Sequence, residues 1–78
     1  MEEYRRKIMD FFVEKGKADG LSLDSDLFED GFVDSLFALE IVVYLEDTFR
    51  VKIKNRDITE ENFRTIDNIA ALVARVKG

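Results

Sequence analysis

The chain has 78 residues, of which 46% are hydrophobic and 37% charged, with a net charge of −5 and neither histidine nor cysteine. This length predicts a single domain over residues 1–78 with a compact core. The missing side chains exclude disulfides, a Ser–His–Asp triad, a cysteine nucleophile and zinc sites built from His or Cys, and the acidic balance argues against nucleic acid as a partner. We therefore expect no catalytic residue, no metal site and no enzymatic activity of its own.

The order of predicted elements is helix, long loop, helix, short helix and helix. Apolar residues repeat at helical spacing from Tyr4 to Phe12, and Gly16 ends this first helix. The stretch from there to Asp34 has no clear period, but its apolar residues are expected to fold it back onto the core. These residues are Leu21, Leu23, Leu27, Phe28 and Phe32. The run Asp24-Ser25-Asp26 predicts a local turn or cap within this loop.

The second predicted helix runs from Leu36 to Phe49, with Asp34 or Ser35 as its N-cap. It carries two apolar stripes, whereas a helix with one buried face needs only one. We assign to the core the stripe formed by Ala38, Ile41, Val42, Leu45 and Phe49. The second stripe consists of Leu36, Leu39 and Val43, flanked by Glu40, Glu46 and Asp47. Being surplus, the second stripe packs on the loop or meets a partner.

An extended connector from Arg50 to Lys54 follows, with Val51 and Ile53 facing inward. Thr59 is predicted to cap a short helix through Phe63, and Thr65 to cap the last helix. The buried stripe of that helix is Ile66, Ile69, Ala70, Val73 and Val76. The predicted fold is thus all-α, a small four-helix bundle of three long helices and one short helix, with a long loop between helices one and two.

Acidic residues are concentrated around Ser35. Between Ala18 and Phe49 the chain has no Lys or Arg but nine acids. They are Asp19, Asp24, Asp26, Glu29, Asp30, Asp34, Glu40, Glu46 and Asp47. This pattern predicts a docking surface for basic partners. Ser35 itself is either a plain N-cap or a covalent attachment point, because the free N–H groups and partial positive charge of a helix N-terminus suit a phosphodiester.

The chain resembles the acyl carrier protein family over nearly its whole length. The resemblance rests on Asp34-Ser35-Leu36 opening a helix that carries Leu39-Glu40, Leu45-Glu46-Asp47 and Phe49, and on the segments 26–31, 49–53 and 65–69. It implies that Ser35, flanked by Asp34, receives 4′-phosphopantetheine from coenzyme A through a separate phosphopantetheinyl transferase. The thiol of that arm would then carry an acyl group as a thioester, and the chain would catalyse nothing.

The family resemblance also implies partners. These are the transferase, a loading enzyme, and downstream synthases or transferases whose basic surfaces read the second helix. We refer to the residues expected to meet them as the partner face: Leu36, Phe37, Leu39, Glu40, Val43, Glu46 and Asp47. The uncharged runs are too short to span a bilayer and no secretory signal opens the chain, so we expect a monomeric cytoplasmic carrier without membrane insertion.

Two departures from the family pattern bear on the pathway. Phe37 stands where fatty-acid carriers usually have an acid, and Phe32-Val33 replaces the small residue often found before Asp34. Both favour discrete carriers of specialised pathways, such as polyketide, peptide-synthetase-associated and D-alanyl carriers. The leading expectation is an acyl carrier of fatty-acid-like, polyketide or other specialised biosynthesis. The runner-up function is therefore an aminoacyl, D-alanyl or peptidyl carrier. A third alternative, an unmodified helical interaction module, explains the acidic surface but gives Ser35 no reason to be exposed.

Overall fold

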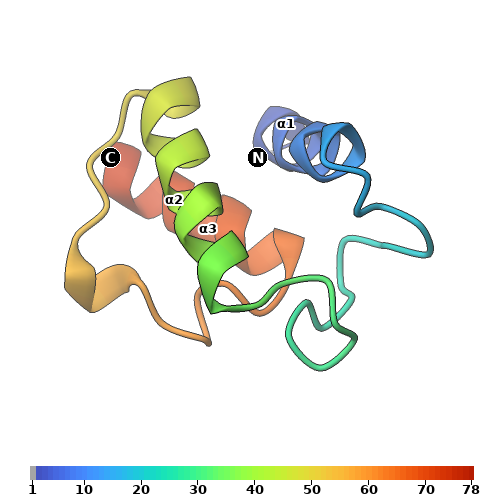
Figure 1. Cartoon of the computed structure of the whole chain (residues 1–78). Coiled ribbons are helices and arrows are strands. Elements are labelled where there is room, and N and C mark those ends of the chain that lie inside the picture. The colour runs from blue at the N-terminus through green and yellow to red at the C-terminus, as the bar shows by residue number, and fades with distance from the viewer. Residues whose placement is uncertain (1) are drawn as a thin grey trace.

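Three α-helices and one 3-10 helix make up the regular structure of residues 2–78, which are the residues that the computed structural model describes (Figure 1). The elements are α1 (Glu2–Glu14), α2 (Ser35–Phe49), η1 (Asn55–Asp57) and α3 (Ile66–Lys77). No strand is found in this described part, so the all-α prediction is confirmed. None of the described helices is long and apolar enough to cross a membrane.

The predicted short helix over residues 59–63 is not confirmed. The Thr59 hydroxyl accepts a hydrogen bond from the Asn62 N–H at 3.2 Å, as a cap would, and the Phe63 N–H donates to the carbonyls of Thr59 and Glu60. This closes one turn only, because Thr65 must adopt extended backbone (φ −136°, ψ 162°) to cap α3 two residues later. The short helical element lies instead at η1, so the predicted position of the short helix is wrong, and a four-helix bundle is not confirmed.

The core lies where the three α-helices and the long loop meet. Its fully buried large side chains are Ile8, Phe12, Leu27, Ile41, Leu45, Phe63, Ile66, Ile69, Leu72 and Val73. The predicted α2 core stripe is confirmed except that Ala38 is only partly buried, and in α3 Val76 is partly buried while Leu72 joins the core. Polar contacts also tie α1 to the other helices: Arg5 Nε donates to Asp67 at 2.7 Å, and the Tyr44 hydroxyl donates to the Lys7 carbonyl at 2.8 Å.

The long loop between α1 and α2 is anchored onto the core, as expected. The N–H of buried Leu27 donates to the Arg64 carbonyl at 2.7 Å, and the N–H of buried Val33 donates to the Leu27 carbonyl at 2.9 Å. Gly31 turns the chain between these two anchors at φ 82°, a conformation that favours glycine. Of the predicted inward residues only Leu23 remains largely accessible, with 38% exposed. Both anchors lie shortly before α2, so they fix where that helix starts.

Asp26 caps a turn inside the loop, which confirms the predicted turn. Its Oδ1 accepts hydrogen bonds from the N–H groups of Glu29 at 2.9 Å and Phe28 at 3.2 Å, and its other oxygen lies 3.5 Å from the Arg64 guanidinium. The Glu29 N–H is the main cause that holds the pKa of Asp26 below its ordinary value, with Arg64 acting in the same direction. The ionised carboxylate therefore helps to hold the loop.

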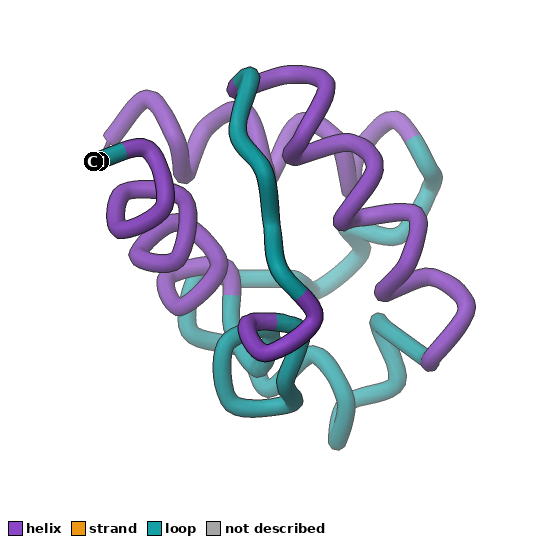
Figure 2. Tube along the Cα trace, turned by 90° about the vertical axis from the view of Figure 1, so that its left-hand side faces the viewer, coloured by secondary structure: helices purple, strands orange, loops and turns teal. Residues whose placement is uncertain are grey.

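The connector after α2 begins where Arg50 adopts the left-handed conformation (φ 56°, ψ 51°) and ends that helix. Ile53 is buried, and its N–H donates to Glu46 Oε2 at 2.9 Å, so the inward orientation predicted for this residue is confirmed. Lys77 Nζ donates to the Phe49 carbonyl at 2.9 Å, which links the ends of α2 and α3. Figure 2 shows the connector descending between these two helices toward η1.

Candidate functional site

Ser35 is the first residue of α2, and Asp34 is its N-cap. Asp34 has extended backbone (φ −114°, ψ −177°), and its Oδ1 accepts a hydrogen bond from the Phe37 N–H at 2.8 Å. Of the two predicted cap residues, Asp34 is thus the one that caps the helix. Ser35 is exposed, and its hydroxyl has no hydrogen-bond partner within residues 2–78. The plain N-cap interpretation of Ser35 is therefore wrong.

The surroundings of this hydroxyl suit a phosphodiester. The first N–H groups of an α-helix have no partner inside the helix, and the N-terminal end carries about half a positive charge. Asp34 takes up the N–H groups of Phe37, through its carboxylate, and of Ala38, through its carbonyl, which leaves those of Ser35 and Leu36 for a ligand. The first turn of α2 holds no acid of its own. A phosphate on the Ser35 oxygen would thus find donors and no carboxylate inside that turn.

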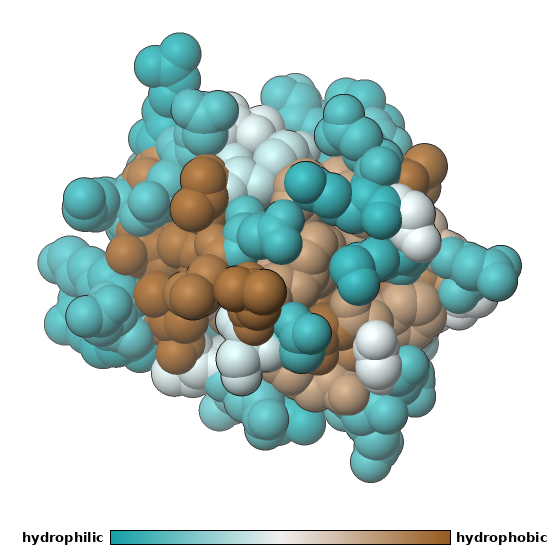
Figure 3. All heavy atoms as spheres, in the orientation of Figure 1, coloured by the Kyte–Doolittle hydropathy of each residue, from teal (hydrophilic) through white to brown (hydrophobic). Residues whose placement is uncertain are grey.

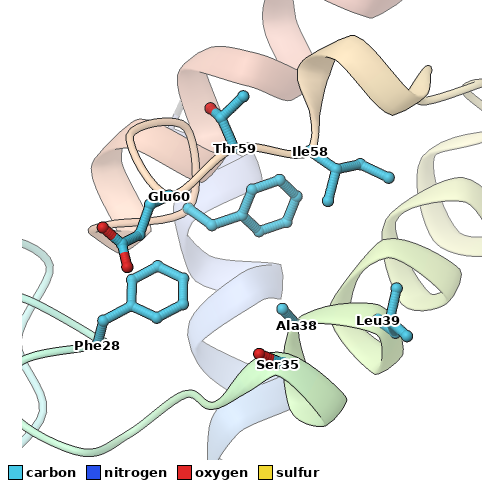
Figure 4. Close-up of a pocket in the computed structure, with 8 residues that line it drawn as sticks. Phe28, Ser35, Ala38, Leu39, Ile58, Thr59 and Glu60 are labelled. Atoms are coloured by element: carbon cyan, nitrogen blue, oxygen red, sulfur yellow. The ribbon is translucent and has the colours of Figure 1, made fainter.

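A hollow of about 250 Å³ lies beside Ser35 (Figure 4). It is lined by Phe28, Ser35, Ala38, Leu39, Ile58, Thr59, Glu60 and Phe63. The α2 residues form one wall, and the segment after η1 faces them from the other side. The lining is mostly carbon, with the oxygens of Ser35, Thr59 and Glu60 at its edge. We did not anticipate this hollow from the sequence, because its far wall comes from the stretch that we assigned to a short helix.

The second apolar stripe of α2 lies on the surface. Leu36 is 70% exposed, Leu39 55% and Val43 66%. In the space-filling view of Figure 3 the most hydrophobic residues gather over α2, and hydrophilic residues lie at the edges of this patch. These three residues belong to the partner face, and the core does not cover them. The same helix buries its other stripe, so the surplus noted in the sequence corresponds to an exposed apolar patch.

The structure contradicts the assignment of Phe37 to the partner face. Its side chain is 4% exposed, and its ring stacks on Phe11 at 5.7 Å and meets the edge of Phe12 at 5.5 Å between centroids. A helix turns by about 100° per residue, so Phe37 points away from Leu36 and toward α1. The prediction that Phe37 places an apolar side chain at the docking surface is wrong, because the ring completes the core between α1 and α2.

The acids of the partner face differ in whether another residue of the fold already binds their carboxylates. Glu40 lies 3.6 Å from Lys15 Nζ, and Glu46 accepts the Ile53 N–H, whereas Asp47 is exposed and has no ion pair among the described residues. The stretch from Ala18 to Phe49 contains no base, but in the fold Lys15 from outside this stretch pairs with one of its acids. We did not predict from the sequence that Lys15 would contact α2. Its spacing from the buried residues of α1 could have indicated this, because Lys15 continues the helical stripe that faces the core.

Comparison with known proteins identifies the family. A family model described as "Phosphopantetheine attachment site" matches residues 7–73. The D-alanyl carrier protein of Lactococcus lactis subsp. lactis (strain IL1403) is 38% identical over 55 residues, 70% of each chain. The probable acyl carrier protein PigG of Serratia sp. (strain ATCC 39006) is 37% identical over 62 residues, 80% of this chain and 71% of its own. This chain belongs to the phosphopantetheine-binding carrier family, whose members hold 4′-phosphopantetheine covalently and are not enzymes themselves.

Proposed function

We propose that Ser35 is the attachment residue, and that the chain holds an acyl group at the end of the 4′-phosphopantetheine arm and presents it to partner enzymes. The observation that carries this proposal is the free hydroxyl at the start of α2. Because Asp34 supplies the cap, Ser35 has no structural task that would explain its hydroxyl. When bound, the arm supplies a thiol that can hold an acyl group as a thioester.

The other Ser and Thr hydroxyls support this choice, since each has a structural role or is partly covered. Ser22 and Ser25 hydrogen-bond to each other at 3.0 Å. Thr59 and Thr65 accept backbone N–H groups as turn and helix caps. Thr48 is partly buried beside Tyr44. An incoming transferase therefore finds one hydroxyl that is both exposed and without a partner in the described chain, at the end of a helix whose charge suits phosphate.

The proposed docking surface is the partner face without Phe37. Leu36, Leu39 and Val43 form its apolar centre, and Glu40 and Asp47 lie along one edge of that stripe. Charges at such an edge mostly set the rate and orientation of encounter, whereas the desolvated apolar centre sets how long the complex lasts. A short-lived complex of this kind suits a carrier that must visit a phosphopantetheinyl transferase, a loading enzyme and a downstream synthase in turn.

The proposed cargo is an acyl group, which fits the similarity to the probable acyl carrier protein of Serratia. A specialised biosynthetic pathway is favoured by the sequence departures at Phe37 and Phe32-Val33. The second candidate is a D-alanyl or other aminoacyl carrier, which the similarity to the D-alanyl carrier protein of Lactococcus favours. The two can be separated with the modified protein in hand. A D-alanine-activating enzyme with ATP and an acyltransferase with acyl-coenzyme A are offered in separate reactions, and intact mass shows which group is loaded.

The attachment itself is tested by intact mass after incubation with coenzyme A and a phosphopantetheinyl transferase of broad specificity. We expect the wild type to gain one phosphopantetheine and Ser35→Ala to gain none. Ser25→Ala is the matched control, because it removes a serine hydroxyl from the preceding loop and should be modified like the wild type. Modification of Ser35→Ala, or of none of the three proteins, would overturn the proposal and favour an unmodified interaction module.

A further inference from the structure

A group of basic residues around the connector is not used by the proposed function. Between Arg50 and Arg56 a base stands at every second position, and the end of α3 adds two more. We call these six residues the basic face: Arg50, Lys52, Lys54, Arg56, Arg75 and Lys77. In Figure 2 the connector faces the reader and runs beside the C-terminal turns of α3. The basic face is thus drawn from two segments that are distant in sequence and adjacent in space.

The alternation along the connector explains why Lys52 and Lys54 share one side. In extended backbone, successive side chains point in opposite directions. Ile53 is buried and Val51 partly buried, so Lys52 and Lys54 point outward, and both are exposed. A hollow of about 290 Å³ lies between the connector and α3, lined by Lys52, Lys54, Arg56, Asp57, Arg75 and Val76. It holds four bases and one carboxylate, which makes it attractive to anions.

The charge of the basic face is not neutralised inside the fold. The ion pairs found among residues 2–78 use Arg5, Lys7, Lys15 and Arg64, and none uses a residue of the basic face. Arg75 donates to the Asn62 side-chain oxygen and Lys77 to a backbone carbonyl, so both keep their full charge without a carboxylate partner. Like charges gathered in this way repel one another, and an external anionic surface relieves that repulsion.

We propose that the basic face adsorbs this carrier to an anionic lipid headgroup surface, without insertion into the bilayer. A lipid surface suits it better than a protein because the face has no apolar centre. The large hydrophobic side chains that are exposed lie elsewhere: Val13, Leu23, Leu36, Leu39 and Val43. Protein interfaces are usually built around an apolar core, whereas clusters of four to eight Lys and Arg attract protein segments to anionic headgroups.

The net charge of −5 does not prevent this adsorption. The 15 residues of α2 put its serine end about 21 Å from its C-terminal end, where the basic face begins. Salt at physiological strength screens charges beyond about 8 Å, so a headgroup surface against the basic face feels little of the acids at the serine end of α2. Glu46, which accepts the Ile53 N–H, and Asp57, which lines the hollow, lie closer and offset part of the charge of the basic face. In the adsorbed carrier, Ser35 would therefore lie at the end of α2 that is farther from the lipid surface.

The test measures binding of the 78-residue chain to phosphatidylcholine vesicles with and without roughly 40% of the anionic lipid phosphatidylglycerol. Binding is read by co-sedimentation at about 0.1 M NaCl, where the screening length is about 10 Å. The variant is Lys52→Glu with Lys54→Glu. Its matched control is Arg6→Glu with Lys17→Glu, two exposed bases outside the basic face. Each pair takes the net charge from −5 to −9, two units per residue.

We expect the wild type and the control pair to bind the anionic vesicles and not the neutral ones. Each base near such a surface contributes about fivefold in affinity, so the Lys52/Lys54 pair should bind at least about 25-fold more weakly. Ser35→Ala should bind like the wild type, which makes a failure here distinct from a failure of the proposed function. Equal loss in both charge pairs, or no binding of the wild type, overturns the proposal. Equally tight binding to a single-stranded DNA oligonucleotide also overturns it, since it would indicate a general polyanion surface.

Discussion

Asp34 and Ser35 are adjacent, yet their replacement by alanine should have opposite consequences. Asp34→Ala removes the carboxylate that accepts the Phe37 N–H at 2.8 Å, and it leaves that partly buried donor without a partner. Loss of an N-cap costs about 1 kcal/mol, within a range of about 0.5–2. Ser35→Ala removes an exposed hydroxyl that has no partner in the described chain, and alanine is the better helix former. Its free energy of unfolding should therefore stay within about 0.5 kcal/mol of the wild type.

For a domain of this size a loss of 1 kcal/mol lowers Tm by about 4–8 °C and moves a urea midpoint by up to about 1 M. Both shifts are measurable by far-ultraviolet circular dichroism. Asp34→Asn is the control, because asparagine caps a helix about as well as aspartate and should restore most of the stability. If Ser35→Ala loses 1 kcal/mol or more, or Asp34→Ala loses nothing, then the division between cap and attachment residue is wrong. Ser35 would then have a structural task.

Three further predictions concern the core, the docking surface and the loop. Phe37→Ala should lose about 3–5 kcal/mol of stability because it empties a site between two rings of α1, whereas Leu36→Ala, at the exposed neighbour, should change stability by less than about 0.5 kcal/mol; thermal unfolding of the pair decides. Asp47→Lys should slow modification by a transferase with a basic surface, most at low salt, and unchanged rates at low salt would show that this acid does not dock. Asp26 has a lowered pKa in the fold, so it contributes stability above its unfolded pKa of about 3.9 and loses it as pH falls through the folded value. The difference in urea midpoint between wild type and Asp26→Asn should accordingly shrink below about pH 4, and a constant difference would mean that the ionised form is not what holds the turn.

The helices and most of the core could be predicted because they depend on local spacing. The core stripe of α2 and the cap at Thr65 are examples, because each is determined by residues a few positions apart in the sequence. Phe37 was misplaced for a different reason. Its position in the motif suggested the surface, and only the packing of α1 across α2, a contact between distant segments, shows that two phenylalanines enclose it.

Long-range contacts also explain the remaining differences. The acidic stretch between residues 18 and 49 contains no base, but Lys15 and Arg64 reach Glu40 and Asp26 from outside it. Charge counted along the chain therefore overstated how free these acids are. The short helix failed because one turn of backbone hydrogen bonds had to end before the extended cap residue of α3. Local spacing in the sequence shows neither these ion pairs nor the requirement that Thr65 be extended to cap α3.

Four consecutive residues at the start of α2 have four different tasks, and helix geometry separates them. Asp34 caps, Ser35 offers a free hydroxyl, Leu36 is 70% exposed and Phe37 is 4% exposed. Since each residue turns the helix by about 100°, a cap and a core anchor can hold the first turn while the two residues between them stay open. Ser35, the proposed attachment residue, therefore stays exposed between the cap at Asp34 and the buried ring of Phe37. The proposed role of Ser35 requires that a transferase reach its hydroxyl, and the burial of Phe37 explains why a bulky aromatic can follow Ser35-Leu36 here without obstructing the site.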